Sequence, residues 1–364
     1  MEKRIHNFSA GPAVLPLSVL KKAQEEFLNF NGLGMSIIEM SHRTKPFETV
    51  LFKTEEKMRA LLSIPENYAI LFLQGGASLQ FSMVPMNLAH AEQSIDMINT
   101  GVWSQKAIKE AKKVAKVRIL ASSEQDQFTH IPSILENQLD PSAAYVHITT
   151  NNTIYGTQYQ QYPHTGDIPL VADMSSDIFS KPFDIKQFGL IYAGAQKNIG
   201  PSGVTVVIIK KDLAERANAA TLPSMLLYKN HIENTSLYNT PNTFGIYMIG
   251  LVMEWIDQQG GLSAIQTINQ KKAACIYDII DSGSFYTSPV KKEHRSLMNI
   301  VFRIKQNNED LEAKFLAEAK AHGFEGLKGH RLVGGLRAST YNALPIESAI
   351  ALAEFMTAFK KKYS

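Results

Sequence analysis

The sequence predicts an α/β protein with a large, mostly parallel, seven-stranded sheet and a smaller C-terminal α+β domain. Three observations predict this class. Short β-rich runs alternate with helical stretches between about residues 68 and 210. Several runs are nearly continuous in Val, Ile, Leu, Tyr and Ala, as is typical of strands covered by helices on both faces. The length of 364 residues favours two domains over one.

The expected elements follow in chain order. The seven predicted strands are 68–73, 94–99, 117–120, 144–149, 168–172, 190–193 and 204–209. Two long helices are expected at 244–259 and 262–281, separated by Gly260 and Gly261, because glycine commonly ends a helix. The second set comprises a strand at 298–304, a helix at 309–322, a strand at 332–339 and a helix at 345–360. We therefore expect a large domain of residues 1–257 and a small domain of residues 258–364, joined by a helix.

The composition excludes several classes of protein. The net charge of +3 is too near balance to indicate a nucleic-acid or membrane surface. One cysteine, Cys275, excludes an intrachain disulfide framework and a cysteine-rich metal site. No run of 18 apolar residues is present, and the first residues do not resemble a secretory signal. We expect a soluble, cytoplasmic protein without a metal.

Lys197 and Asp173 are the most informative residues. Lys197 lies among small residues in the segment 193–203, and Asp173 directly follows the predicted strand 168–172. A lysine amine can form a Schiff base with an aldehyde, and a carboxylate at a buried strand end can keep a pyridine nitrogen protonated. Pyridoxal phosphate chemistry requires both groups. The alternative is an ordinary solvated lysine in a glycine-rich loop.

Ligands of parallel sheets collect at the carboxyl ends of the strands. The first two predicted strands end in residues that can bind a phosphate or a flat ring. The first strand leads into Gly75, Gly76, Ala77 and Ser78, a turn that can present backbone amides and a hydroxyl to an anion. An ordinary tight turn is the alternative. The second strand leads to Trp103, which can stack on a flat heteroaromatic ring, although tryptophan is more often a core residue.

Three further polar residues follow other predicted strands. Thr153 lies in a polar loop after 144–149 that can reach a phenolic oxygen on a bound ring. Ser175 follows Asp173, and Gln196 precedes Lys197, so each can donate to a phosphate. Complementary groups at five strand ends are harder to attribute to chance than any one of them.

Basic residues gather in two other segments and favour an anionic substrate. Arginine can bond two oxygens of a carboxylate or phosphate at once, although a single arginine is more often part of a surface ion pair. The residues are His42 and Arg43 in one segment, and His330, Arg331 and Arg337 in the other.

These motifs resemble those of the phosphoserine aminotransferases, a family of fold-type I pyridoxal phosphate enzymes of serine biosynthesis. The resemblance extends over essentially the whole chain. Its most specific parts are Gln-Lys-Asn-Ile-Gly-Pro from Gln196 and Gly-His-Arg from Gly329. It also includes Asn-Phe-Ser-Ala-Gly-Pro from Asn7 and Tyr-Asn-Thr-Pro-Asn from Tyr238.

The resemblance implies a role for each cofactor-binding residue. Lys197 forms the Schiff base, Asp173 pairs with the pyridinium nitrogen and Trp103 stacks on the ring. Thr153 bonds the phenolic oxygen. The cofactor phosphate is held by Ala77, Ser78, Ser175 and Gln196, and by Asn239 and Thr240 of the neighbouring subunit. The resemblance therefore implies a homodimer with shared active sites.

It also implies the substrate-binding residues. Arg337 takes the α-carboxylate, and His42 and Arg43 face the distal anion together with His330 and Arg331, the latter pair expected from the partner chain. The sequence departs from the family at one place. Some branches carry an arginine in the glycine-rich loop, whereas residues 74–81 contain no basic group and Ser78 stands at about that position.

The implied reaction transfers the amino group of L-glutamate to 3-phosphohydroxypyruvate, giving O-phospho-L-serine and 2-oxoglutarate. Lys197 is the general base and acid, and 3-hydroxy-2-oxo-4-phosphooxybutanoate is an alternative substrate. Two other functions are alternatives. A cysteine desulfurase needs a reactive loop cysteine, whereas Cys275 lies in a predicted helix, where a buried thiol is expected. A pyridoxal phosphate-binding regulator normally adds a DNA-binding module, for which few residues remain.

Overall fold

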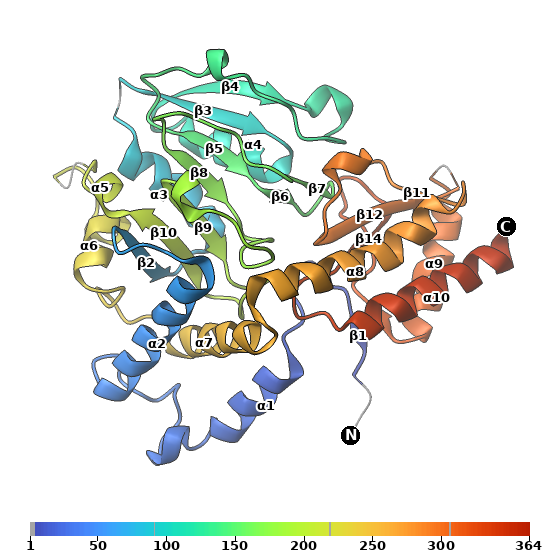
Figure 1. The fold of residues 1–364 in the computed structure, drawn as a ribbon, viewed down its shortest axis with the longest axis horizontal. Helices are drawn as coiled ribbons and strands as arrows, with labels where there is room; N and C mark the ends of the chain where they lie inside the picture. Colours follow the sequence, from blue (N-terminus) through green and yellow to red (C-terminus); the bar gives the residue numbers. More distant parts are fainter. Residues whose placement is uncertain (1–3, 91, 218–219, 306) are drawn as a thin grey trace.

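The computed structural model describes residues 4–90, 92–217, 220–305 and 307–364. Its centre is a seven-stranded sheet in the order β2-β10-β9-β8-β5-β3-β4 (Figure 1). The strands are β2 (Tyr68–Leu73), β3 (Ser94–Asn99), β4 (Lys116–Ser122), β5 (Val146–Thr149), β8 (Leu170–Asp173), β9 (Leu190–Gly194) and β10 (Thr205–Lys210). β10 is antiparallel to both neighbours and the other adjacent pairs are parallel. The predicted sheet is confirmed, and each expected run overlaps a strand.

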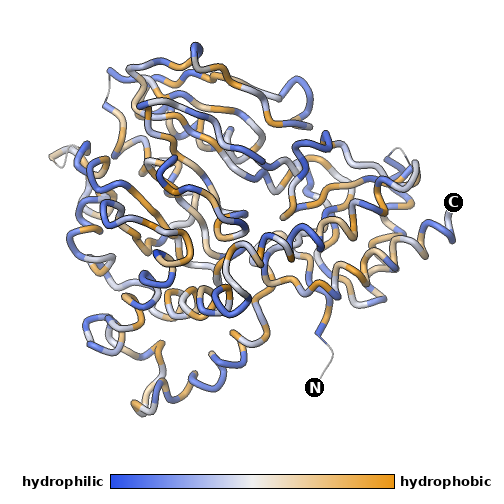
Figure 2. Tube along the Cα trace, viewed as in Figure 1, coloured by the Kyte–Doolittle hydropathy of each residue, from blue (hydrophilic) through white to orange (hydrophobic). Residues whose placement is uncertain are grey.

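Helices cover both faces of this sheet because alternate residues of its strands point to opposite sides. In β10, Val206 and Ile208 belong to one apolar core, and Val207 and Ile209 to the other. The first core is completed by α1 (Leu17–Glu26), α2 (Lys45–Leu62) and α7 (Thr243–Gln258). The second core is completed by α3 (Gly76–Leu88), α4 (Val102–Ala111), α5 (Lys211–Ala214) and α6 (Tyr228–Glu233). Figure 2 shows the apolar residues concentrated along the strands.

The C-terminal part forms a second, smaller unit. Its three-stranded antiparallel sheet consists of β11 (Tyr286–Thr287), β12 (Asn299–Ile304) and β14 (Leu336–Ser339). Its helices are α8 (Gly261–Asp281), α9 (Glu309–Ala321) and α10 (Ile346–Tyr363). The strand expected at 332–339 begins only at Leu336. Gly334 and Gly335 turn the chain with φ of 70° and 68°, and a Cβ on Gly335 would lie 2.4 Å from Arg303 Cδ.

Helix α8 joins the two parts, as expected. Its first residues, such as Leu262, pack in the core of the large part, whereas those from Ala273 onward pack in the core of the small part. The boundary between residues 257 and 258 stays a prediction. Several contacts cross it; for example, β1 (His6–Asn7) pairs with β13 (Phe324–Glu325), and Phe8 is buried in the small-part core.

The remaining elements are short. A two-stranded hairpin is formed by β6 (Asn151–Asn152) and β7 (Thr157–Gln158). Short 3₁₀ helices occur at Phe30–Gly32, Glu124–Asp126, Glu136–Gln138, Ile185–Gln187, Ser224–Leu226 and Lys292–His294. Within the described part of the chain, no helix is both long and apolar enough to cross a bilayer.

Candidate active site

The strand register brings the predicted loops to one edge of the sheet. Thr205 pairs with Leu73 on one side and with Gly194 on the other. The loops after β2 and β9 therefore begin on either side of one strand, roughly 10 Å apart. Asp173 likewise pairs with Thr149 and with Tyr192. The carboxyl ends of these strands thus surround a common region.

Lys197, Trp103 and Thr153 meet at this edge, although they follow three different strands. Lys197 Nζ lies 5.1 Å from the centre of the Trp103 ring. Trp103 Nε1 donates a hydrogen bond to Thr153 Oγ1 at 2.9 Å. This bond fixes the orientation of the indole plane, so a flat ring bound beside Trp103 would have a defined place to stack.

Lys197 and Asp173 influence each other electrostatically. Asp173 is buried, and its Oδ1 accepts a hydrogen bond of 2.9 Å from the Ser175 backbone amide. Burial raises the pKa of the Asp173 carboxyl, against the opposing effects of Lys197 and Ser175. Burial lowers the pKa of the Lys197 amine, with Asp173 opposing and Arg337 adding to the decrease. An amine with a lowered pKa is a better general base near neutral pH.

The turn into α3 is built to receive an anion. Gly75 has φ of 91°, and a Cβ there would lie 2.7 Å from Leu79 Cβ, so the turn requires glycine. No described side chain caps the start of α3. The first-turn amides of Ala77 and Ser78 are therefore free to bind a negative group.

Ser175 and Gln196 both lie against Gly194, across β10 from that turn. Ser175 Oγ accepts a 3.1 Å hydrogen bond from the Gly194 amide, and the Ser175 hydroxyl also interacts with the Asp173 carboxylate. The Gln196 side chain folds over the same glycine, because a Cβ on Gly194 would lie 2.7 Å from Gln196 Oε1. Together these donors fit the phosphate of a cofactor.

Asn239 and Thr240 lie beside Gln74 of the same chain. Asn239 Nδ2 donates to Gln74 Oε1 at 2.9 Å, and Gln74 Nε2 donates to the Thr240 carbonyl at 3.2 Å. Gln74 is not among the residues predicted from the sequence, although it directly precedes Gly75. Asn239 and Thr240 therefore lie at the rim of the anion-binding turn, where Thr240 is exposed.

Arg337 has a free edge suited to a carboxylate. Its Nη1 donates to the Thr153 carbonyl at 2.8 Å, and its Nε is buried without a hydrogen-bond partner among the described residues. A buried unpaired guanidinium nitrogen is costly unless a ligand pairs with it. The free Nε of Arg337 therefore fits the α-carboxylate role expected of it.

His330 lies near Arg337 of its own chain. The Gly329 amide donates to the Gly335 carbonyl at 2.9 Å, so the segment folds back on itself. Burial lowers the pKa of His330, and the charges of Arg337, Arg331 and Lys106 lower it further. His330 therefore lies within electrostatic reach of Arg337 in its own chain, and the expected contribution of His330 and Arg331 to the partner's site stays a prediction.

Lys106 is a further candidate, outside the residues predicted from the sequence. It lies one helical turn after Trp103 in α4, and its Nζ is 4.7 Å from the centre of the Trp103 ring. The spacing of three residues from Trp103 was the available signal, since such residues share a helix face. Lys106 adds a positive charge beside the same indole that Lys197 faces.

Among the described residues, no hydrogen bond or ion pair links His42 or Arg43 to Lys197. They precede α2, which packs against α7. Arg43 is exposed, and His42 Nε2 is buried without a partner among the described residues. Cys275 lies in α8 as expected, but it is partly exposed rather than buried, because it faces a shallow groove beside α10.

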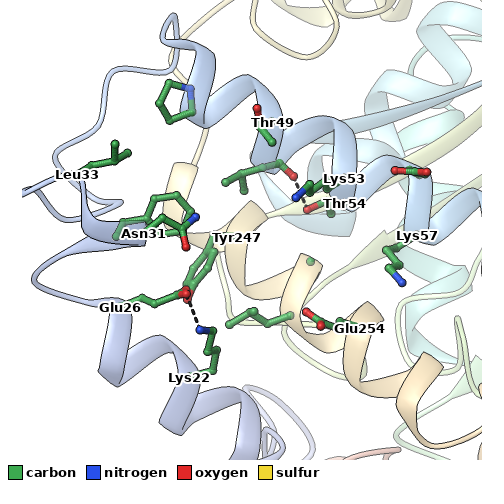
Figure 3. Close-up of a pocket in the computed structure, with 16 residues that line it drawn as sticks. Lys22, Glu26, Asn31, Leu33, Thr49, Lys53, Thr54, Lys57, Tyr247 and Glu254 are labelled. Atoms are coloured by element: carbon green, nitrogen blue, oxygen red, sulfur yellow. Dashed lines mark hydrogen bonds and ion pairs between the residues drawn. The ribbon is translucent and has the colours of Figure 1, made fainter.

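A separate cavity of about 610 Å³ lies between α1, α2 and α7 (Figure 3). In it Tyr247 donates a hydrogen bond to Glu26, which also forms an ion pair of 2.7 Å with Lys22. The predicted site residues do not line this cavity.

The fold and the site define an aminotransferase, and the model of the family "Aminotransferase class-V" matches residues 5–348. The phosphoserine aminotransferase of Lysinibacillus sphaericus (strain C3-41) is 56% identical over 364 residues, which cover 100% of both chains. That of Geobacillus kaustophilus (strain HTA426) is 55% identical over 363 residues, with the same coverage. The chain belongs to the phosphoserine aminotransferase family.

Solved structures agree with this family assignment. The phosphoserine aminotransferase from Bacillus circulans subsp. alkalophilus has a TM-score of 0.96 and 50% identity, covering 99% of each chain. The pyridoxal phosphate-bound enzyme from Trichomonas vaginalis has a TM-score of 0.92 and 39% identity, covering 97% of this chain and 100% of that one. Membership of this family sets aside the cysteine desulfurase and the regulator.

Proposed function

We propose that this protein transfers the amino group of L-glutamate to 3-phosphohydroxypyruvate, giving 2-oxoglutarate and O-phospho-L-serine, with pyridoxal phosphate bound at Lys197. The observation that carries the proposal is the position of Lys197, which faces Trp103 and interacts electrostatically with the buried Asp173. The names of the most similar relatives support the choice of substrates.

Pyridoxal phosphate supplies an aldehyde that carries the amino group and a ring that withdraws electrons from the substrate Cα. Asp173 keeps the ring nitrogen protonated, because a buried carboxylate is strongly stabilised by a cation beside it. Trp103 stacks on the ring, and Thr153 bonds its phenolic oxygen. The phosphate is held by Ala77, Ser78, Ser175 and Gln196.

Lys197 moves the proton. Its Nζ takes the proton from Cα of the amino donor and, in the second half-reaction, returns a proton to Cα of the keto acid. The lowered pKa of this amine supports the role, because the neutral form is then more populated near pH 7. Arg337 binds the α-carboxylate that all four substrates and products share.

Lys106, His330 and Arg331 bind the distal anion from the same chain. Lys106 and Lys197 face the same indole, with their amines within about 10 Å of each other. The phosphorus of phosphoserine lies roughly 4 Å from its Cα, three single bonds away. A substrate whose Cα is beside Lys197 can therefore extend its phosphate toward Lys106. The missing loop arginine is compensated in this way.

The active unit is a homodimer. Seven large apolar residues in the stretch 17–38 are exposed in the single chain, a density that indicates a covered surface. They are Leu17, Leu20, Phe27, Leu28, Leu33, Met35 and Ile38. The exposed Arg43 and the unpaired His42 follow this stretch and reach the partner's site, as do Asn239 and Thr240. A cytoplasmic location belongs to the proposal, because the single cysteine requires no oxidising compartment.

Separate half-reactions test the proposal. Glutamate and O-phosphoserine, added in separate titrations, should each shift the visible absorption of the cofactor-loaded protein. As an alternative acceptor, 3-hydroxy-2-oxo-4-phosphooxybutanoate should reverse the shift that the amino donor causes. Arg331→Ala should weaken O-phosphoserine more than glutamate, by about 1–3 kcal/mol, because a phosphate carries nearly two charges and a γ-carboxylate one. Equal losses for both amino acids would contradict a phosphate-binding role for Arg331.

A further inference from the structure

Lys272 is a buried basic residue outside the site described so far. It lies in α8, and its side chain is completely buried. Its Nζ donates to the Tyr341 carbonyl at 2.6 Å and to the Asn342 carbonyl at 3.3 Å. Burial lowers the pKa of this amine, and no neighbouring charge offsets the decrease. Burying an amine without a carboxylate is costly, so these two bonds are its whole compensation.

The carbonyls that Lys272 holds belong to the segment directly after β14, the strand that carries Arg337. The Tyr341 hydroxyl donates to the Ala10 carbonyl at 2.8 Å and accepts a 3.2 Å bond from Asn299 Nδ2. Asn299 lies in β12, which pairs with β14. Lys272 is therefore one of the residues that anchor the segment following β14, the strand of Arg337.

The same segment is bonded to the neighbour of Lys197. The Asn342 amide donates to Asn198 Oδ1 at 2.9 Å, and Asn198 Nδ2 donates to the Ile178 carbonyl at 2.7 Å. The Asn342 side chain donates to the Phe179 carbonyl at 2.8 Å. All the side chains in this network are buried. A continuous path of hydrogen bonds therefore runs from Lys272 through Asn342 to Asn198.

We propose that Lys272 is a positioning residue, which sets the separation of Arg337 and Lys197 through the backbone of residues 341 and 342. The inference rests on the proposed function, in which Arg337 binds the α-carboxylate while Lys197 moves the proton on the adjacent Cα. These two tasks act on neighbouring atoms of one small molecule, so the separation must be accurate. A displacement of about 1 Å can reduce the rate of an enzyme about 100-fold.

Lys272→Met tests the role, because it removes both hydrogen bonds and keeps an unbranched side chain. We expect kcat to fall about 10- to 100-fold, and the loss to be equal in the glutamate and O-phosphoserine half-reactions, since both amino acids share the α-carboxylate. Ile276→Val is the matched control. Ile276 is buried one turn further along α8 and forms no side-chain hydrogen bond, so this variant should lose thermal stability and keep its kinetic constants.

The outcomes are distinct. A Lys272→Met protein that is folded, loaded with cofactor and within threefold of the wild-type kcat would overturn the positioning role alone. Wild-type protein that responds to neither amino acid would overturn the proposed function and this inference with it. A loss confined to melting temperature, as in the control, would show that Lys272 only stabilises the fold.

A second variant covers the case in which Lys272→Met does not fold. Asn198→Ala breaks the final bond of the path and leaves Lys272 in contact with Tyr341 and Asn342. It should show the same equal loss in the two half-reactions. Where Lys272→Met does fold, the combined variant should lose less than the product of the two single effects. Unchanged kinetic constants in Asn198→Ala would refute the path.

Discussion

Gly11→Ala should impair catalysis from outside the set of residues that touch the substrate. Gly11 has φ of 141°, and an added Cβ would lie 3.2 Å from Lys197 Cγ. The next residue but one, Ala13, donates its amide to the Gln196 carbonyl at 2.9 Å, so this N-terminal segment covers the Lys197 loop. The backbone strain should cost about 1–3 kcal/mol of stability. The contact should displace the Lys197 stem by a few tenths of an ångström and reduce kcat/KM about tenfold.

Gly166→Ala provides the matched control for the strain. Gly166 has φ of 57°, and no atom lies within 4 Å of its added Cβ. This variant should lose stability through strain alone and keep wild-type activity. Thermal unfolding and steady-state kinetics of both variants separate the two effects. If Gly11→Ala loses only as much stability as the control and retains wild-type kcat/KM, the contact with Lys197 does not limit catalysis.

Three further predictions concern the site and its surroundings. Asp173→Asn should retain cofactor and lose transamination by orders of magnitude, and near-normal rates would place the electron-withdrawing role elsewhere. Lys197→Ala should abolish borohydride fixation of the cofactor. Mixing this variant with an Asn239→Ala/Thr240→Ala variant should restore activity, because hybrid dimers then contain one intact site. No recovery after verified subunit exchange would show that each site is built from one chain. Burial lowers the pKa of Lys272 to about 7 from 10.5, so the unfolded chain binds more protons between these values and stability rises with pH across them. The unfolding free energy of wild type relative to Lys272→Met should therefore increase by up to about 4 kcal/mol from pH 7 to 10, and a constant difference in denaturant titrations would contradict this.

The meeting of Lys197, Asp173, Trp103 and Thr153 could be predicted because each follows a strand that the sequence reveals. Parallel strands bring their carboxyl ends to one edge, so the order of the strands was not needed. The start of β14 could not be placed in this way. The apolar pattern continues through residues 332 and 333, and only the left-handed glycines that follow them interrupt the strand.

Residues that act through distant contacts were harder to find. Gly11 contacts Lys197, and Lys272 bonds to residues 341 and 342, across separations that no local pattern encodes. A signal for Lys272 did exist. Ile265, Asn269, Lys272 and Ile276 recur at spacings of three and four, which places two polar residues on the buried face of α8. Polar residues in such positions indicate a specific buried partner.

Under the proposed function, the exposure of the basic residues would let one site accept two different distal groups. Arg337 is held by the Thr153 carbonyl and presents one free edge, so it suits the α-carboxylate, which does not change between half-reactions. Lys106 and Arg331 are exposed and carry long side chains, which can adjust to a planar γ-carboxylate or to a tetrahedral phosphate. A rigid arrangement at the distal end would favour one substrate and slow the other. Under the proposed function, the site would therefore combine a fixed cation for the common group with adaptable cations for the group that differs.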